Sequence, residues 1–155
     1  MIKLEDIRKL NSKEKSMTSG FKTSGIQLEA WVEERFKSFV RQPAKSDYDF
    51  IYNGLGVDVK GCSASAYGYN IFIETVQNTK IGSIPTHIKK PDCILFYVDY
   101  ETGICYMINW KKMLTKLQAN QHPEVSGGYN AMGYKINIFD HLDCIMVIET
   151  FKEKV

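Results

Sequence analysis

The chain has 155 residues, of which 44% are hydrophobic and 25% are charged. This length and composition are typical of a single globular domain and exclude wholesale disorder. With 20 Lys and Arg against 18 Asp and Glu, the net charge is only +2. That balance excludes nucleic-acid binding by bulk charge alone, but it leaves room for a locally basic groove.

The four cysteines show neither zinc-ribbon nor redox spacing, because no two of them are separated by two to four residues. We expect reduced, mostly buried thiols. No apolar run reaches the ~20 residues of a membrane span. The N-terminus has charges in its first turn and no apolar region typical of a signal peptide. We therefore expect a cytoplasmic protein, in its own cell or in a host cell, with no membrane partner.

The first segment of the chain, residues 1–24, is polar and mildly basic, and we expect an N-terminal arm with at most one short helix. Residues 25–155 are expected to form the single domain. Apolar residues recur at steps of three and four from Gln27 to Val40, which predicts an amphipathic helix. Pro43 is expected to end it.

A hairpin is predicted next. Residues 48–51 read as a strand, Asn53-Gly54 is a strong two-residue turn signal, and residues 57–60 alternate apolar and charged side chains. A further strand is expected at residues 69–76. The apolar run at residues 93–99 predicts a strand that is buried on both faces.

The second half of the chain is expected to add a strand over residues 104–109, a helix over 110–117 and a final strand over 142–150. Residues 118–133 are polar and contain two adjacent glycines, so we expect a loop. Residues 61–68 and 78–90 are also expected to be loops. The order of elements predicts a mixed α/β domain.

The predicted hairpin concentrates groups that can carry chemistry. Asp58 and Lys60 lie on one face of their strand because side chains alternate with a period of two. The turn brings Asp49 beside that face. Two carboxylates can hold Mg²⁺, which prefers oxygen ligands and can lower the pKa of a bound water. A neighbouring lysine can orient that water.

The arrangement of Asp49, Asp58 and Lys60 around an Asn-Gly turn resembles the PD-(D/E)XK nuclease superfamily. A Gly25-x-x-x-Glu29 element on the preceding helix is similar to one found in many small members. The resemblance implies a restriction-endonuclease-like core, a central mixed β-sheet flanked by helices. It also implies an active site in which Asp49, Asp58 and Glu29 bind Mg²⁺, with Mn²⁺ able to substitute, and Lys60 positions the attacking water.

Two points of the resemblance stay open. The strand after the lysine offers Glu74 as a further metal ligand and Gln77 as another candidate for that position. The Pro-Asp pair of the family pattern is missing. Asp49 is preferred as the ligand because it heads the apolar stretch, but Asp47 has the same parity along the strand.

Other polar residues carry weaker expectations. His87, His122 and His141 lack metal-ligand spacing, so each is expected in the core or on the surface. A basic rim that contacts DNA phosphates is expected from three lysines of the second half, namely Lys80, Lys89 and Lys90.

The resemblance thus implies a Mg²⁺-dependent DNA endonuclease, a hydrolase of phosphodiester bonds. The short chain favours structure-selective or weakly specific cutting, as in Holliday-junction resolvases and phage-type nucleases. Cutting both strands needs two active sites, so a homodimer with C2 symmetry is expected. Two alternatives remain: a non-catalytic nucleic-acid or protein-binding module, and a restriction-type enzyme whose specificity comes from residues 118–133.

Overall fold

The computed structural model describes residues 3–15, 23–128 and 130–149. It is an α/β arrangement, as the order of predicted elements indicated. In chain order, its elements are α1 (Leu4–Lys15), α2 (Thr23–Arg35), β1 (Val40–Arg41), β2 (Phe50–Tyr52), β3 (Leu55–Cys62), the 3-10 turn η1 (Ala64–Tyr67), β4 (Asn70–Val76), α3 (Thr86–Lys89), β5 (Cys93–Asp99), β6 (Ile104–Asn109), α4 (Trp110–Ala119), β7 (Glu124–Gly128), β8 (Ala131–Asn137), the 3-10 turn η2 (Ile138–His141) and β9 (Ile145–Glu149).

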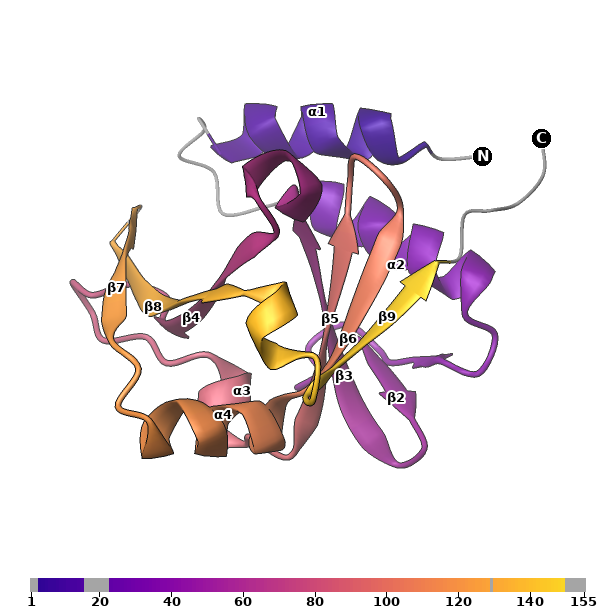
Figure 1. Cartoon of the computed structure of the whole chain (residues 1–155). Helices are drawn as coiled ribbons and strands as arrows, with labels where there is room; N and C mark the ends of the chain where they lie inside the picture. The colour runs from indigo at the N-terminus through magenta and orange to yellow at the C-terminus, as the bar shows by residue number, and fades with distance from the viewer. Residues whose placement is uncertain (1–2, 16–22, 129, 150–155) are drawn as a thin grey trace.

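The strands of the described residues form two sheets. The larger is a mixed sheet of six strands in the order β1-β2-β3-β5-β6-β9, and the smaller has the order β4-β8-β7. β3 and β5 pair in parallel because β4 and α3 lie between them in the chain and provide the crossover. α1 and α2 lie on one side of the larger sheet, whereas the smaller sheet and α4 lie on the other (Figure 1).

Each face of the larger sheet buries its own apolar cluster. On the first face, Val57 of β3 and Phe96 of β5 pack with Trp31 of α2 and Ile7 of α1. On the other face, alternate residues of the same strands pack against the smaller sheet and α4. All seven residues of β5 are buried, which confirms the predicted two-sided burial of residues 93–99.

The β2–β3 hairpin forms as the Asn-Gly signal predicted. Asn53 and Gly54 both have positive φ, 49° and 77°, which is the geometry of a two-residue turn matched to the strand twist. The register pairs Phe50 with Val57. On β3, the ring of Tyr48 packs directly against the backbone of Gly56, where a Cβ would overlap it.

The N-terminal region differs from the expected arm. Residues 4–15 form a full helix whose Ile7 has no exposed surface, so this part belongs to the packed fold. Its buried Glu14 accepts hydrogen bonds from the backbone N–H groups of Thr23 (2.6 Å) and Ser24 (2.9 Å). That contact satisfies two orphan donors of α2 and starts the helix before Gly25. The rest of the predicted arm lies outside the described residues.

Two other predicted boundaries were wrong. The helix expected to reach Val40 ends at Arg35, because Val40 pairs with Ile51 as part of β1. The loop expected over residues 118–133 contains β7 and the start of β8. All five residues of β7 are exposed, and most of them are polar or small. The segment therefore lacks the alternation of apolar and polar residues that marks a half-buried strand.

The loops expected over residues 61–68 and 78–90 contain short helical turns, η1 and α3, which the sequence did not predict, and β3 continues to Cys62. The other elements of the second half agree with the sequence. β6 spans the predicted residues, α4 begins at the predicted Trp110, and β9 falls within the predicted final strand. All four cysteines are free thiols; three are buried and Cys62 is half-buried. None of the helices in the described part of the chain has the length and apolar character needed to span a bilayer.

Candidate active site

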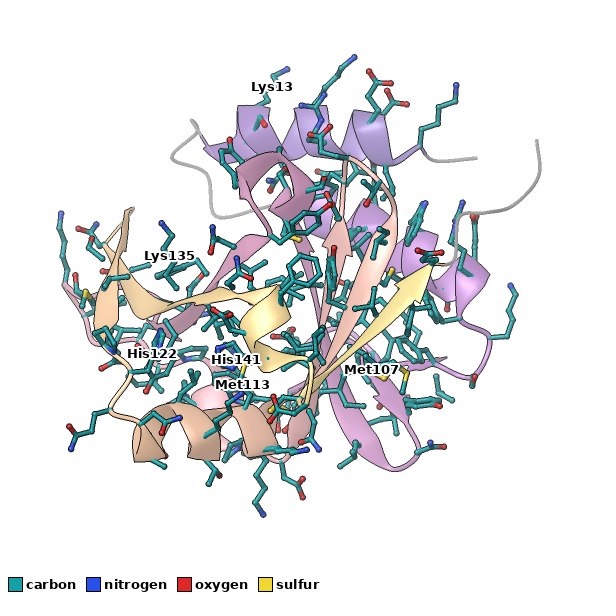
Figure 2. The ribbon with its side chains drawn as sticks, viewed as in Figure 1. Lys13, Met107, Met113, His122, Lys135 and His141 are labelled. Atoms are coloured by element: carbon teal, nitrogen blue, oxygen red, sulfur yellow. The ribbon has the colours of Figure 1, made fainter. Side chains whose placement is uncertain are left out.

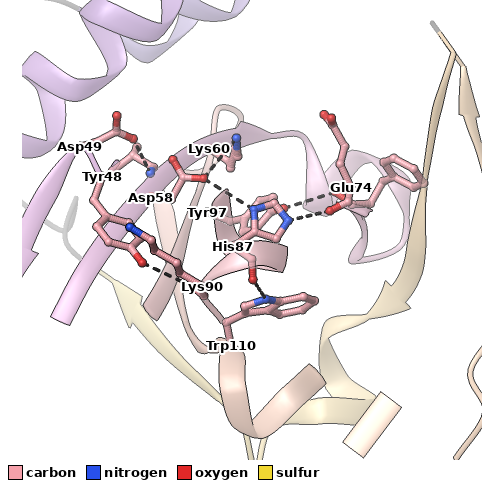
Figure 3. Close-up of polar contacts among 11 residues, drawn as sticks. Tyr48, Asp49, Asp58, Lys60, Glu74, His87, Lys90, Tyr97 and Trp110 are labelled. Carbon is pink, nitrogen blue, oxygen red and sulfur yellow. Dashed lines mark hydrogen bonds and ion pairs between the residues drawn. The ribbon is translucent and has the colours of Figure 1, made fainter. Parts of the chain in front are cut away.

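The β2–β3 hairpin brings two aspartate side chains close together. Asp49 directly precedes β2, and its backbone N–H donates to the carbonyl of Val57 (3.0 Å), the residue that pairs with Phe50. This contact holds Asp49 against β3, where its side chain interacts with that of Asp58. One carboxylate oxygen of Asp49, Oδ2, accepts a hydrogen bond from the N–H of Val59 (2.8 Å), so the side chain lies against β3 (Figure 3).

Asp58 and Lys60 share one face of β3, as their spacing predicted. The Lys60 Nζ atom lies 3.3 Å from Oδ2 of Asp58 (Figure 3). Both side chains are partly exposed, by 23% for Asp58 and 36% for Lys60, so the pair is accessible from outside. Burial lowers the pKa of Lys60, but the negative charges of Asp58, Glu74 and Asp49 outweigh it and the pKa is raised. Lys60 is therefore a fixed positive charge at neutral pH.

Asp49 is the strongly perturbed acid of this group. Burial, followed by the negative charge of Asp58, raises its pKa from 3.8 to about 7. The hydrogen bond from Val59 acts in the opposite direction, and Glu29 adds a further raising contribution. The negative charges of Asp58 and Glu29 near Asp49 are therefore not fully neutralised by nearby positive groups.

Glu29 reaches the same neighbourhood from α2. Its side chain is 25% exposed and lies 3.7 Å from the guanidinium of Arg41 on β1. Burial raises its pKa, Arg41 lowers it, and Asp58 raises it again. Because the charge of Asp58 raises the pKa of Glu29, and the charge of Glu29 raises the pKa of Asp49, the structure brings the predicted helix carboxylate close to the hairpin acids.

Glu74 lies across from Lys60 on β4, the first strand of the smaller sheet (Figure 3). Its charge helps raise the pKa of Lys60. Gln77 does not join the group: it is exposed, and its backbone N–H donates to Ser83 (2.8 Å) in the turn that follows β4.

The sequence left Asp47 and Asp49 open, and the structure separates them. Asp47 is exposed and its carboxylate lies 2.6 Å from Nζ of Lys90. The hydrogen bond and charge of Lys90 hold the pKa of Asp47 below its usual range. Asp49 faces Asp58, and Asp47 does not join that pair.

The three predicted rim lysines have different surroundings. Lys89 and Lys90 lie at the end of α3, and Lys80 lies in the turn after β4, where its backbone N–H donates to Asn78 (3.0 Å). All three are exposed. Lys90 already pairs with Asp47, so Lys80 and Lys89 are the better placed of the three to meet an added anion.

His87 also lies at the site, although its position in the sequence does not predict this. It belongs to α3, is only 3% exposed, and its Nδ1 lies 3.9 Å from Oδ2 of Asp58 (Figure 3). Its Nε2 donates to the backbone carbonyl of Glu74 (2.6 Å). Burial lowers the pKa of His87, which keeps the ring neutral. The crossover between β3 and β5 brings His87 to Asp58, and no motif in the neighbouring sequence predicts this contact.

The other two histidines lie elsewhere. His122 and His141 are on the side of the molecule formed by α4 and the smaller sheet (Figure 2). His122 contacts the backbone carbonyl of Lys135 at 2.9 Å, and His141 is buried in η2. The expectation of a core or surface position holds for both.

The carboxylate oxygens of this site are of the kind that bind a cation, although the side chains do not form a complete binding site in this structure. In the part of the chain that the structure describes, no three His, Cys, Asp or Glu side chains are grouped tightly enough to hold a metal ion. The carboxylates nevertheless outnumber the two neighbouring cations, Lys60 and Arg41. A divalent cation would offset both causes of the raised pKa of Asp49, its burial and the negative charge of Asp58.

Comparison of the chain with protein-family models, with curated proteins and with solved structures finds no match. The residues and geometry of the site itself therefore indicate its function.

Proposed function

We propose that this chain is a Mg²⁺-dependent DNA endonuclease that hydrolyses phosphodiester bonds. The observation that supports it best is the proximity of the Asp49 and Asp58 side chains, with the Lys60 ammonium 3.3 Å from Asp58. Ordinary surface ion pairs do not need a second, half-buried carboxylate whose pKa is raised to about 7.

In this proposal, Asp49 and Asp58 hold the cation directly, and Glu29 and Glu74 complete the acidic surroundings. Bound Mg²⁺ would supply positive charge for the scissile phosphate and lower the pKa of an attacking water. Lys60, whose ammonium is held by Asp58, orients that water and offsets charge that develops on the phosphate. Asp49 releases its proton when the cation binds, because its raised pKa falls once a positive charge is nearby.

The DNA partner is proposed to contact the exposed lysines around the site. Lys80 and Lys89 supply phosphate contacts, and Lys90 contributes after exchange of its Asp47 partner. The near-neutral net charge of +2 predicts that binding depends on such local contacts. We propose structure-selective or weakly specific cutting by a homodimer, because two cuts need two copies of one site.

The proposal is tested by cleavage of a four-way junction and of a linear duplex of the same sequence. Each substrate is incubated with Mg²⁺, with Mn²⁺ and with EDTA. Metal-dependent cutting supports the nuclease, and the ratio of the two rates separates a junction resolvase from a general endonuclease. Light scattering of the same preparation tests the homodimer.

Two variants make this test specific. Lys60→Met removes the site ammonium, and Lys37→Met makes the same change at an exposed lysine in the segment after α2. Loss of cutting in the first variant alone supports the proposal. Absence of cutting by wild-type protein with both metals would favour a non-catalytic binding module, and discrete fragments from genomic DNA would favour a sequence-specific enzyme.

A further inference from the structure

His87 is held rigidly beside the acidic site. Its Nε2 donates to the Glu74 carbonyl (2.6 Å), and its own backbone carbonyl accepts a hydrogen bond from Nε1 of Trp110 (2.8 Å). The edge of one ring faces the other, with the centroids of His87 and Trp110 5.5 Å apart. The imidazole therefore cannot turn without breaking the hydrogen bond from Nε2 and the ring contact with Trp110.

These contacts fix the tautomer of His87. A carbonyl oxygen only accepts hydrogen bonds, so the hydrogen of the neutral ring must be on Nε2. Nδ1 then carries a lone pair. That atom is buried and has no hydrogen-bond partner within the described residues. It lies 3.9 Å from Oδ2 of Asp58.

A buried acceptor, Nδ1, thus faces a partly exposed acceptor that already has Lys60 beside it at 3.3 Å, and the buried atom itself lacks a positive partner. Ligand atoms about 2.1 Å from one transition-metal ion are about 3 Å apart at right angles and about 4.2 Å apart on opposite sides. The observed separation of 3.9 Å falls between these limits. Small movements of the partly exposed Asp58 and Lys60 would admit an ion between them.

We propose that Nδ1 of His87 is a nitrogen ligand of the cation held by Asp58, so that the site prefers a first-row transition ion such as Mn²⁺ to Mg²⁺. The inference rests on the cation site of the proposed function and not on its DNA chemistry. Imidazole nitrogen suits transition metals, whereas Mg²⁺ favours oxygen ligands and retains its waters. The hydrogen bond from Nε2 to Glu74 is the kind of outer contact that orients a metal-binding histidine.

The test uses full-length, metal-stripped protein titrated with MnCl₂ and, separately, with MgCl₂. Paramagnetic resonance of Mn²⁺ gives its affinity, and electron-spin-echo modulation reports a directly bound nitrogen. The test variant is His87→Gln, because the glutamine amide can still donate to the Glu74 carbonyl while Nδ1 is lost. The matched control is His141→Gln, the same change at another buried histidine with an unpartnered Nδ1, placed in η2.

Wild-type protein should show nitrogen modulation and bind Mn²⁺ at least about tenfold more tightly than Mg²⁺. His87→Gln should lose the modulation and about tenfold in Mn²⁺ affinity, with little change for Mg²⁺, and His141→Gln should match wild type. Absence of nitrogen modulation in wild type, or unchanged Mn²⁺ affinity in His87→Gln, would overturn the inference.

The same titration separates this inference from the proposed function. If Asp58→Asn abolishes binding of both ions but wild type shows no bound nitrogen, the cation site stands and the role of His87 is refuted. If the nitrogen is bound but no DNA is cut, the metal site stands and the nuclease is refuted. If neither ion binds wild type, both fail.

Discussion

Replacing Asp49 with Asn should stabilise the metal-free protein at alkaline pH. The pKa of Asp49 is raised from 3.8 to about 7, so between these values the folded protein keeps a proton that the unfolded chain has released. The free energy of unfolding therefore falls as the pH rises through this window and is constant above it. At 1.36 kcal/mol per unit of pKa, this shift corresponds to a loss of up to about 4 kcal/mol.

Asparagine removes the charge but keeps an oxygen that can accept from the N–H of Val59. The neutral hydrogen bond is weaker than the one to a carboxylate, by about 1 kcal/mol. We therefore expect Asp49→Asn to be about 2–3 kcal/mol more stable than wild type at pH 8.5. At pH 4 the two proteins should differ by no more than about 1 kcal/mol.

Urea unfolding in EDTA at several pH values measures both quantities, with equal slopes against denaturant as the check that the folded states are alike. An Asn variant that is less stable than wild type at pH 8.5 would refute the reasoning. So would a difference between the two proteins that stays constant from pH 4 to 8.5. Either result would mean that Asp49 is not held in an unfavourable charged environment.

Three further predictions concern stability and use the same unfolding assay. Gly61→Ala should lower the free energy of unfolding by about 1–3 kcal/mol, because its Cβ would overlap the Tyr100 hydroxyl. Gly25→Ala in α2 meets open space and should raise the free energy of unfolding by about 0.5–1 kcal/mol. Equal effects of the two substitutions would contradict this. Trp110→Phe keeps an aromatic ring but leaves a buried carbonyl without its donor, so a loss of about 1–3 kcal/mol is expected, and no loss would show that this bond is dispensable. Glu14→Ala removes the acceptor of two N–H groups of α2 and should cost about 1–2 kcal/mol, with an unchanged midpoint as the contrary result.

The sequence carried most of the information on the larger sheet. The Asn53-Gly54 turn, the alternation around Asp58 and the apolar run of β5 are local signals, and each produced the element it predicts. The same signals bring Asp49, Asp58 and Lys60 together, since the two-residue turn folds the segment that carries Asp49 back along β3.

Features that depend on distant contacts were not predictable. α2 starts early because Glu14, on another helix, accepts from its first N–H groups, and no neighbouring residue encodes this. β7 has no buried face, so its pairing with β8 leaves no hydrophobic period in the sequence. His87 reaches Asp58 only after the crossover has packed α3 against β3.

The central claim is that the site of Asp49, Asp58 and Lys60 hydrolyses phosphodiester bonds with a divalent cation. The most direct test is the rate at which wild-type and Asp58→Asn protein cut a labelled four-way junction in Mg²⁺, with the masses of the fragments determined. The account predicts fragments that sum to the substrate plus one water per cut, and a loss of at least about 10²–10³ in rate for the variant. Equal rates for the two proteins, or no cutting by wild type, would contradict it.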